Sequence, residues 1–267
     1  MGAPLPLLPG EAGVRSALTG LPLDIAFVSA AALRLVDPVL AVVFPSECPA
    51  CGRLLAHPAR GPLCEACWAS LPRHHAIACG CGLPLLPGRP ACGRCRRGRQ
   101  PFAAGASLGP YEGPLRVVLH ELKYRGRRRA SGRLAEALLE AEAVRALVSS
   151  SDVLVPVPLH PRRLRERGFN QSALLAAEVG RRMGRPVCAD ALVRRLDTVP
   201  QAGLTAAARR RNVAGAFAVG RRASVAGRTV VLVDDVLTTG ATAFACARRL
   251  GEAGAAEVRL LTVARVA

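Results

Sequence analysis

The sequence predicts an α/β protein in which a mostly parallel sheet carries helices on both faces and follows a small cysteine-rich domain. Three observations support this fold class. Strand-like and helix-like patterns alternate through residues 101–267, and such alternation builds parallel sheets. Hydrophobic residues make up 51% of the chain but aromatic residues only 3%, so Ala, Val and Leu must fill the core. Of the 10 cysteines, all but two fall between Cys48 and Cys95.

The sheet domain, residues 101–267, shows strand and helix patterns in turn. They are a strand at Ala103–Leu108, helices at Pro114–Tyr124 and Ser131–Leu147, a strand at Asp152–Val157, a helix at Asn170–Met183, a strand at Thr229–Val233, a helix at Ala241–Ala253 and a strand at Glu257–Ala264. Pro114 suits the first turn of a helix. Asn170 can cap the free amides of the helix that it opens, and Gly254 is typical of the position after a helix end.

Residues 1–46 precede the cysteine-rich domain as a leader with one apolar helix. Its apolar stretch, Leu23–Phe44, is interrupted by charged residues and a proline. It therefore predicts an amphipathic helix rather than a membrane span, and no basic segment or cleavage site marks a secretory signal. We expect a cytoplasmic protein without a membrane span. The pattern does not indicate an oligomeric state.

The net charge of +18 comes almost entirely from arginine, because Lys123 is the only lysine. A basic chain attracts nucleic acids and polyphosphate ligands alike. Much of the charge can also be explained by solvated arginines on helix faces. Lys123 is retained either for a function that needs a lysine or by chance.

The cysteine-rich domain, residues 47–100, has too few periodic apolar positions to fold around a core of its own, so a bound metal would stabilise it. Cys48, Cys51, Cys64 and Cys67 form two CxxC pairs with the spacing of a zinc ribbon, and four thiolates make a closed tetrahedral site. An iron–sulfur cluster is the main alternative metal, and disulfides conflict with the expected reducing compartment.

A second cysteine set is less regular. Cys92 and Cys95 form a CxxC pair, but Cys79 and Cys81 are separated by a single residue. Gly80 and Gly82 can absorb this slip in a local turn. The four cysteines therefore leave open whether the domain binds one zinc ion or two. We expect Cys188 and Cys246 to be small buried residues rather than ligands. Trp68 is expected to pack against the zinc knuckle, with stacking on a nucleic-acid base as the alternative.

The run VVLVDDVLTTGAT, Val230 to Thr242, combines a buried strand, two carboxylates and the start of a helix. Ligands bind at the carboxyl ends of strands in parallel α/β sheets. The segment Thr238–Thr242 offers helix N-terminal amides, three hydroxyls and a glycine, which together suit a monophosphate. Asp234 and Asp235 can accept hydrogen bonds from vicinal sugar hydroxyls. The alternative is an aspartate pair that only closes a turn.

This run closely resembles the phosphoribosyl-diphosphate (PRPP) signature of type I phosphoribosyltransferases. Together with other segments it resembles the ComF family over about residues 45–266. These segments are the cysteine-rich domain, PYEGPLRVVLHELKYRGR, LVPVPLHPRRLRERGFNQS and PQAGLTAAARRRNVAGAF. The resemblance implies a type I phosphoribosyltransferase fold, PRPP with Mg²⁺, and a link to natural competence and DNA uptake. It leaves the acceptor substrate open.

The resemblance also assigns roles to individual residues. PRPP binding falls to Asp234, Asp235, Val236, Leu237, Thr238, Thr239, Gly240, Ala241 and Thr242. Pyrophosphate binding falls to Lys123, Arg125, Pro158, Leu159, His160, Arg162 and Arg163, with the two last arginines in a loop after a strand. A mobile cover would comprise Arg167, Gly168, Phe169, Asn170 and Gln171. Arg209–Asn212, preceded by Gln201, would be a further segment near the substrate.

The chemistry of this class is substitution at the anomeric carbon with pyrophosphate as the leaving group. Asp234 and Asp235 would stabilise an oxocarbenium-like transition state, and Lys123 with the arginines and Mg²⁺ would stabilise pyrophosphate. Two hypotheses stay open. The protein is either an enzyme of unknown acceptor or a binding protein, which senses PRPP or contacts single-stranded DNA and the DNA-uptake machinery.

Overall fold

A computed structural model describes residues 45–74, 79, 95–97, 101–197, 213, 215–220 and 225–266 of the chain. The expected leader helix at Leu23–Phe44 lies outside these residues, as do Cys81, Cys92, Gln201 and Arg209–Asn212. Within the described ranges, no helix is long and apolar enough to cross a membrane.

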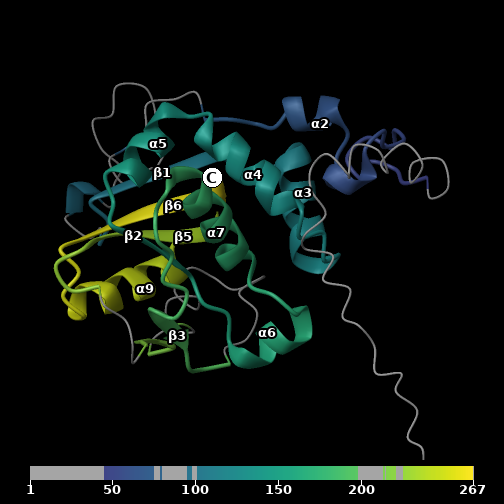
Figure 1. Cartoon of the computed structure of the whole chain (residues 1–267). Helices are drawn as coiled ribbons and strands as arrows, with labels where there is room; N and C mark the ends of the chain where they lie inside the picture. The colour runs from purple at the N-terminus through teal and green to yellow at the C-terminus, as the bar shows by residue number, and fades with distance from the viewer. Residues whose placement is uncertain are drawn as a thin grey trace, which may run out of the picture.

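The centre of the molecule is a parallel sheet with the strand order β1-β6-β5-β2 (Figure 1). Its strands are β1 (Ala104–Pro110), β2 (Val153–Pro156), β5 (Thr229–Leu237) and β6 (Glu257–Arg265). Every pairing in this sheet is parallel, as the alternating pattern predicts. The strands that face helices on both sides read as continuous apolar runs, which is typical of a parallel sheet buried on both faces.

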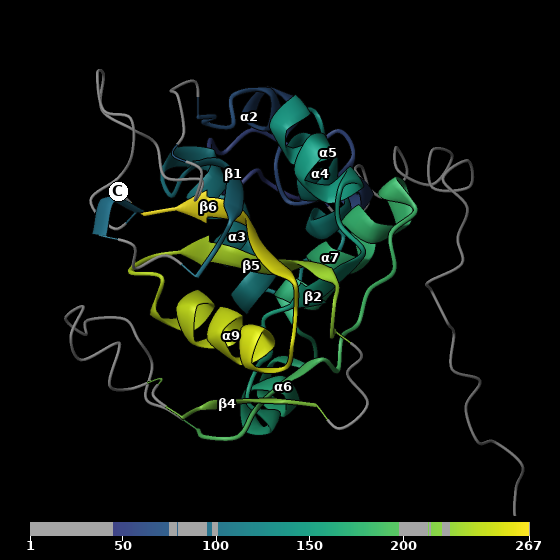
Figure 2. The ribbon, with the colours of Figure 1, turned by 90° about the vertical axis from the view of Figure 1, so that its left-hand side faces the viewer.

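Alternate residues of β5 point to opposite faces of the sheet and separate two cores. Val231 and Val233 belong to the first core. Its helices are α3 (Gly113–Tyr124), α4 (Ala130–Leu139), α5 (Glu142–Ser149) and α7 (Gln171–Met183). Val230 and Leu232 belong to the second core, under α9 (Ala241–Glu252). Figures 1 and 2 show α4 and α5 on one side of the sheet and α9 on the other. The predicted fold class is confirmed.

A separate two-stranded antiparallel sheet lies on the α9 side of the central sheet. It consists of β3 (Leu192–Arg194) and β4 (Phe217–Val219). Figure 2 shows β4 on the far side of α9 from the central sheet. A strand of three residues is too short to show a clear alternation of apolar and polar residues. The sequence therefore did not predict this small sheet.

Three predicted elements differ in the structure. The helix expected at Ser131–Leu147 is two helices, α4 and α5, because Ala141 adopts an extended conformation between them. The strand expected to stop at Val233 continues to Leu237, since β6 still pairs with it there. The loop expected around Arg162 and Arg163 is instead the short helix α6 (Pro161–Arg167), which has no buried residue and hence no apolar periodicity.

The cysteine-rich segment packs directly on the sheet domain. Its short helix α2 (Glu65–Ala69) places Trp68 in the same hydrophobic core as α4. Arg133 of α4 donates two hydrogen bonds to Glu65, at 2.8 and 2.7 Å, and its guanidinium lies 4.6 Å from the centre of the Trp68 ring. Since Trp68 is 5% exposed, it packs as expected, and the alternative of base stacking is wrong. The turn η2 (Pro58–Arg60) follows the first CxxC pair, and η3 (Cys95–Arg97) precedes the sheet domain.

The chain leaves this segment against the edge strand β1. A Cβ atom on Gly109 would lie 1.9 Å from the carbonyl oxygen of Pro72, so only glycine fits at this contact;. The backbone amide of His74 donates a hydrogen bond of 2.9 Å to the carbonyl of Leu108. The two parts of the chain are therefore in contact through their backbones as well as their side chains.

Candidate functional site

The two aspartates lie at the carboxyl edge of the sheet, beyond the end of one neighbouring strand. Strand β2 pairs with Val230–Val233 of β5 and ends there, whereas β6 continues alongside Asp234 and beyond. Thus Asp234 and Asp235 keep a paired backbone on one side and border the exit of β2 on the other. This is the place in a parallel α/β sheet where ligands bind.

Asp234 is a buried carboxylate, and in the part of the chain that the structure describes no cation lies at hydrogen-bonding distance from it. Its Oδ1 accepts hydrogen bonds from the Ser172 hydroxyl at 3.2 Å and from the Asp235 amide at 2.9 Å. Burial, reinforced by the negative charge of Asp235, raises its pKa to about 7;. Lys123 lowers the same pKa but does not outweigh these two effects.

Asp235 is paired with the only lysine of the chain. Lys123 Nζ, at the end of α3, lies 2.5 Å from Asp235 Oδ2, and the two side chains are 17% and 6% exposed. The amide of Val236 donates to Asp235 Oδ1 at 2.7 Å. Burial alone would lower the pKa of Lys123, but the charge of Asp235 outweighs it and the pKa is raised. Lys123 therefore carries its charge at the site.

The threonine loop follows β5 directly and leads into α9. Gly240 caps α9 with a φ of 76°, a left-handed conformation that favours glycine;. Thr239 Oγ1 accepts a hydrogen bond of 3.4 Å from the Ala241 amide. The amides of the first turn of this 12-residue helix consequently face the same edge of the sheet as the carboxylates, an arrangement that suits an anion;.

The segment after β2 carries an ion-pair network rather than a set of unpaired cations. Pro158 and Leu159 lead from β2 to His160, whose Nδ1 accepts from the Arg162 amide at 3.3 Å and caps α6. Arg162 contacts Asp197 at 3.1 Å and Glu166 at 2.9 Å.

The other predicted cations of this region stand at two places. Arg163 lies 4.0 Å from Glu166 in the same network. Arg125 caps the end of α3 and is exposed. Acidic partners therefore hold three of the predicted pyrophosphate ligands, namely Lys123, Arg162 and Arg163.

The residues predicted as a cover connect α6 to α7 and contact the α3–α4 corner, which we define as residues 124–129. Arg128 donates to the Gly168 carbonyl at 3.2 Å and lies 4.8 Å from the centre of the buried Phe169 ring. Arg167 lies 5.3 Å from the Tyr124 ring and donates to Gln171 at 2.7 Å.

One further residue of this connection reaches back toward β2. Asn170 caps α7, as predicted, and also donates to the carbonyl of Val157 at 3.0 Å. The contacts of Arg128 and Arg167 thus join the α3–α4 corner to the connection between α6 and α7, beside the carboxylates.

The four cysteines of the first set converge, as their spacing predicts. The sulfur atoms of Cys48, Cys51, Cys64 and Cys67 all lie within 4.8 Å of one another, which fits a tetrahedral zinc site;. Burial would raise the pKa of Cys48, but neighbouring amide groups, that of Cys64 foremost, outweigh it and lower the pKa to about 7. This favours a thiolate at Cys48, whereas burial and the neighbouring cysteines raise the pKa of Cys67;.

The remaining cysteines have different environments. Cys79 is buried and Cys95 is half-buried, while their predicted partners Cys81 and Cys92 lie outside the described residues. Cys246 is fully buried, as expected. The same expectation is wrong for Cys188, which is half-buried and contacts Asp190 at 3.3 Å.

Several contacts at the site were not predicted from the sequence. The sequence pattern does not indicate that Ser172 reaches Asp234. Nor does it indicate that Arg128 joins the α3–α4 corner to Gly168. Arg194 of β3 is near enough to Asp234 for their charges to interact, and burial lowers the pKa of this arginine.

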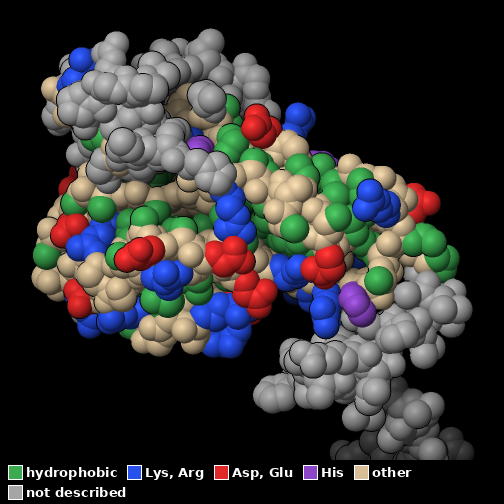
Figure 3. All heavy atoms as spheres, turned by 90° about the horizontal axis from the view of Figure 1, so that it is seen from above, with side chains coloured by type: hydrophobic (Ala, Val, Ile, Leu, Met, Phe, Trp, Pro, Cys, Tyr) green, Lys and Arg blue, Asp and Glu red, His purple; other side chains and the backbone are tan. Residues whose placement is uncertain are grey.

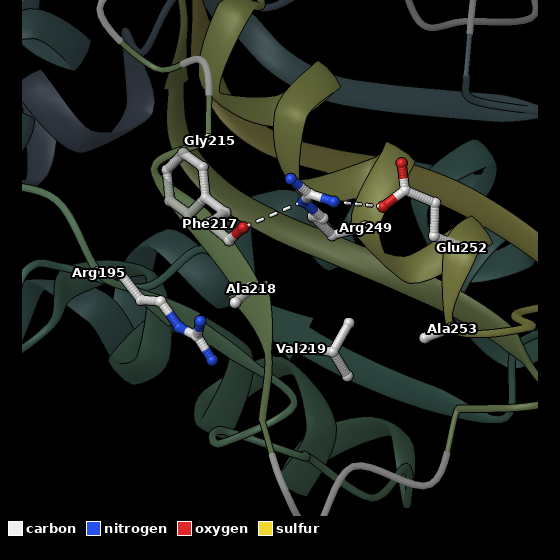
Figure 4. Close-up of a pocket in the computed structure, with 8 residues that line it drawn as sticks. All are labelled: Arg195, Gly215, Phe217, Ala218, Val219, Arg249, Glu252 and Ala253. Carbon is white, nitrogen blue, oxygen red and sulfur yellow. Dashed lines mark hydrogen bonds and ion pairs between the residues drawn. The ribbon is translucent and has the colours of Figure 1, made fainter.

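A pocket of about 450 Å³ lies elsewhere, between β4 and the end of α9. Figure 4 shows Arg249 in its wall, hydrogen-bonded to the Phe217 carbonyl at 3.1 Å and to Glu252 at 2.6 Å. None of its lining residues was predicted to bind PRPP or pyrophosphate. Figure 3 shows another face on which Lys or Arg, Asp or Glu and hydrophobic side chains are mixed, rather than an uninterrupted positive patch.

Comparison with known proteins matches both parts of the chain. A double zinc ribbon domain matches residues 39–96, and a phosphoribosyl transferase domain matches residues 181–267. A DNA utilization protein of Escherichia coli O157:H7 is 33% identical over 207 residues, covering 76% of this chain and 90% of that protein. Competence protein F of Haemophilus influenzae is 29% identical, covering 78% and 93% of the two chains.

Among solved structures, a purine phosphoribosyltransferase of Pyrococcus horikoshii matches with a TM-score of 0.30 and 18% identity, over 52% of this chain and 81% of that one. The match to the Escherichia coli relative establishes kinship over most of this chain. With a double zinc ribbon followed by a phosphoribosyltransferase domain, the chain belongs to the ComF family of competence and DNA utilization proteins.

Proposed function

We propose that this protein binds PRPP at the carboxyl end of β5 and transfers its phosphoribosyl group to an acceptor in connection with DNA uptake. The observation that carries the proposal is the position of Asp234 and Asp235 directly before the threonine loop at the start of α9. Carboxylates recognise sugar hydroxyls, and the helix N-terminus recognises a phosphate. PRPP contains a ribose and a 5′-phosphate in one molecule. The carboxylates and the threonine loop that would bind them lie in one segment of the chain.

The pyrophosphate end of the ligand then faces the cationic residues around α6. Arg162 and Arg163 lie after β2, and Arg125 and Arg127 lie on the α3–α4 corner. Their acidic partners Glu166 and Asp197 would be displaced, because pyrophosphate carries more negative charge than either carboxylate. Arginine is suited to this exchange, since its planar fork binds phosphate oxygens in pairs.

In the reaction, the bond between the anomeric carbon and the pyrophosphate oxygen breaks, and pyrophosphate leaves with the electron pair. The acceptor forms the new bond to that carbon, and its proton passes to an oxygen of the departing pyrophosphate. The carboxylates stabilise the positive charge that develops on the ribose. We assign His160 to holding the corner rather than to taking the proton, because its Nδ1 already accepts from the Arg162 amide.

Magnesium fits the same donors, since Mg²⁺ prefers oxygen ligands and retains several waters. Asp234 and Asp235, together with oxygens of PRPP, would hold it, and it would neutralise part of the pyrophosphate charge. We also infer a reducing, cytoplasmic location, because the converging thiols of the first cysteine set are suited to metal binding;.

A second candidate function is a PRPP sensor or single-stranded DNA adaptor without turnover. It is favoured by the α3–α4 corner, where four arginines are exposed beside Tyr124, which is itself 65% exposed; they are Arg125, Arg127, Arg128 and Arg129. Aromatic rings stack on bases and arginines contact phosphates, so such a corner suits single-stranded nucleic acid. The names of the relatives, a DNA utilization protein and a competence protein, agree with either function.

The test is isothermal titration of the full chain with PRPP and Mg²⁺, followed by a pyrophosphate-release screen over nucleobases and DNA. We expect the Asp234→Asn/Asp235→Asn variant to bind PRPP at least about tenfold more weakly, as expected when two hydrogen-bonding carboxylates are lost. The matched control is Glu136→Gln/Glu140→Gln, which removes the same charge from exposed positions in α4 and at its C-terminal cap.

Equal PRPP affinity in wild type and the site variant would contradict the proposed site. Binding that is lost in the site variant, with no pyrophosphate released for any acceptor, would favour the sensor or adaptor.

A further inference from the structure

We propose that Lys123 is a positioning residue for the ribose-binding carboxylate Asp235 and does not contact pyrophosphate. The inference rests on the proposed function, because it concerns how that site holds its ligand. It reassigns the residue that the family resemblance places among the pyrophosphate ligands.

The geometry directs Lys123 toward the ribose side of the site. Its ammonium lies 2.5 Å from Asp235 Oδ2, while the other oxygen of Asp235 accepts from the Val236 amide. With 17% of its side chain exposed, Lys123 is held by α3 against the sheet. The arginines that can reach a pyrophosphate are exposed and lie at the ends of α3 and along α6.

The pair has a clear physical purpose. A carboxylate that is 6% exposed, next to a second carboxylate, is costly to keep ionised without a cation;. Lys123 supplies that cation inside the chain. Its contact with Oδ2 fixes the orientation of the carboxylate, so that Asp235 can accept a hydrogen bond from a ribose hydroxyl. Among the described residues, Asp234 is held by Ser172 and a backbone amide instead of a cation.

This role also accounts for a lysine in a chain whose other cations are all arginine. An ammonium is a compact point charge that needs one contact, whereas a guanidinium is a planar fork that seeks two parallel ones. At Asp235 only Oδ2 is directed to the cation, because Oδ1 is taken by the Val236 amide. The site therefore favours lysine.

The experiment separates the two halves of PRPP. Ribose 5-phosphate and inorganic pyrophosphate are titrated separately into wild type and into Lys123→Met, Asp235→Asn and the double variant. We expect Lys123→Met to weaken ribose 5-phosphate binding about tenfold, as for a buried charge left without its partner, and to leave pyrophosphate binding within about twofold, the scatter expected when no direct contact is lost. In the Asp235→Asn background, Lys123→Met should have no further effect on ribose 5-phosphate.

Arg125→Met is the matched control, since it removes one positive charge two residues away. It should weaken pyrophosphate binding and spare ribose 5-phosphate. If Lys123→Met does not fold, the double variant removes both charges, and its comparison with Asp235→Asn still decides the matter.

Equal losses for both ligands in Lys123→Met, or a further loss in the Asp235→Asn background, would overturn the inference. Unchanged affinities in Lys123→Met with normal wild-type binding would overturn it while leaving the proposed function intact. Failure of wild type to bind PRPP and both of its halves would overturn the proposed function and this inference together.

Discussion

The thiol cluster and the carboxylate pair pose the same electrostatic problem and solve it differently. Both crowd groups that become negative, four sulfurs within 4.8 Å in one region and two adjacent aspartates in the other. The cysteine set is built for a cation from outside the chain, a zinc ion. The aspartate pair has a cation from within the chain, Lys123, which contacts Asp235. The first solution is evident from residue spacing, and the second is evident only in three dimensions.

The largest expected effect on stability comes from removing a ligand of the zinc ion. Cys67→Ser removes one zinc ligand next to Trp68, whose ring is part of the core shared with α4. We expect loss of zinc and a decrease in the free energy of unfolding of about 5 kcal/mol or more, since structural zinc contributes folding energy directly. Metal analysis and urea unfolding measure both. Cys188→Ser, outside the cluster, is the control and should retain zinc; retention of zinc by Cys67→Ser would contradict the site.

Asp234, the aspartate that Lys123 does not contact, should make the free energy of unfolding depend on pH. Its pKa is about 7 in the folded state and near 3.8 when unfolded, so the folded state binds more protons between these values. Wild-type stability should therefore fall as pH rises from about 4 to 7, by about 2–4 kcal/mol. Asp234→Asn should lose this slope. Its stability relative to that of wild type should therefore be greater at pH 8 than at pH 4.

Urea unfolding across that pH range measures the slope. Glu136→Gln, an exposed carboxylate-to-amide change on α4, should leave it as in wild type. A slope that persists unchanged in Asp234→Asn would show that another group titrates.

A smaller effect is expected where the two regions meet. Arg133→Met removes the paired hydrogen bonds to Glu65 and the contact with the Trp68 ring, at a cost of about 1–2 kcal/mol;. Arg182→Met is matched to it, because Arg182 is 26% exposed against 24% for Arg133 and also pairs with a glutamate. Thermal unfolding of both variants compares them. Equal losses of stability in the two variants would mean that the contact with the cysteine-rich segment contributes nothing beyond an ordinary ion pair.

The smallest effect on stability is expected at the cationic corner. Arg162 is 65% exposed, as is Arg181 on α7, and each contacts a glutamate. Neither Arg162→Met nor Arg181→Met should shift the unfolding midpoint measurably, since exposed ion pairs contribute little. Only Arg162→Met should weaken pyrophosphate binding, by a few-fold, in a titration at fixed salt. Equal pyrophosphate affinities in the two variants would remove Arg162 from the site.

Sequence alone predicted the elements that have long apolar runs or clear end signals. The strands β1, β2 and β6 and the helices α3, α7 and α9 all fall near their expected bounds. The break at Ala141 was missed because it contains neither glycine nor proline. Helix α6 was missed because it buries no side chain.

The candidate site divides in the same way. Asp234, Asp235 and the threonine loop are contiguous, so a local pattern was enough to predict them. The Lys123–Asp235 pair, the Ser172–Asp234 bond and the Arg128–Gly168 bond join segments that are distant in sequence. Their formation depends on how α3 and α7 pack on β5, which no local pattern specifies.

The contact at Gly109 has a consequence for the exposed border of the sheet. Strand β1 is the outermost strand on its side, and a free strand edge is a template for pairing with another chain;. The passage of Pro72 over Gly109 and the bond from His74 to Leu108 cover part of that edge. We therefore expect the end of the zinc-binding segment to hinder pairing of β1 with a second chain. A chain that lacks the residues before position 100 would expose this edge and would also lack the zinc-binding cysteines.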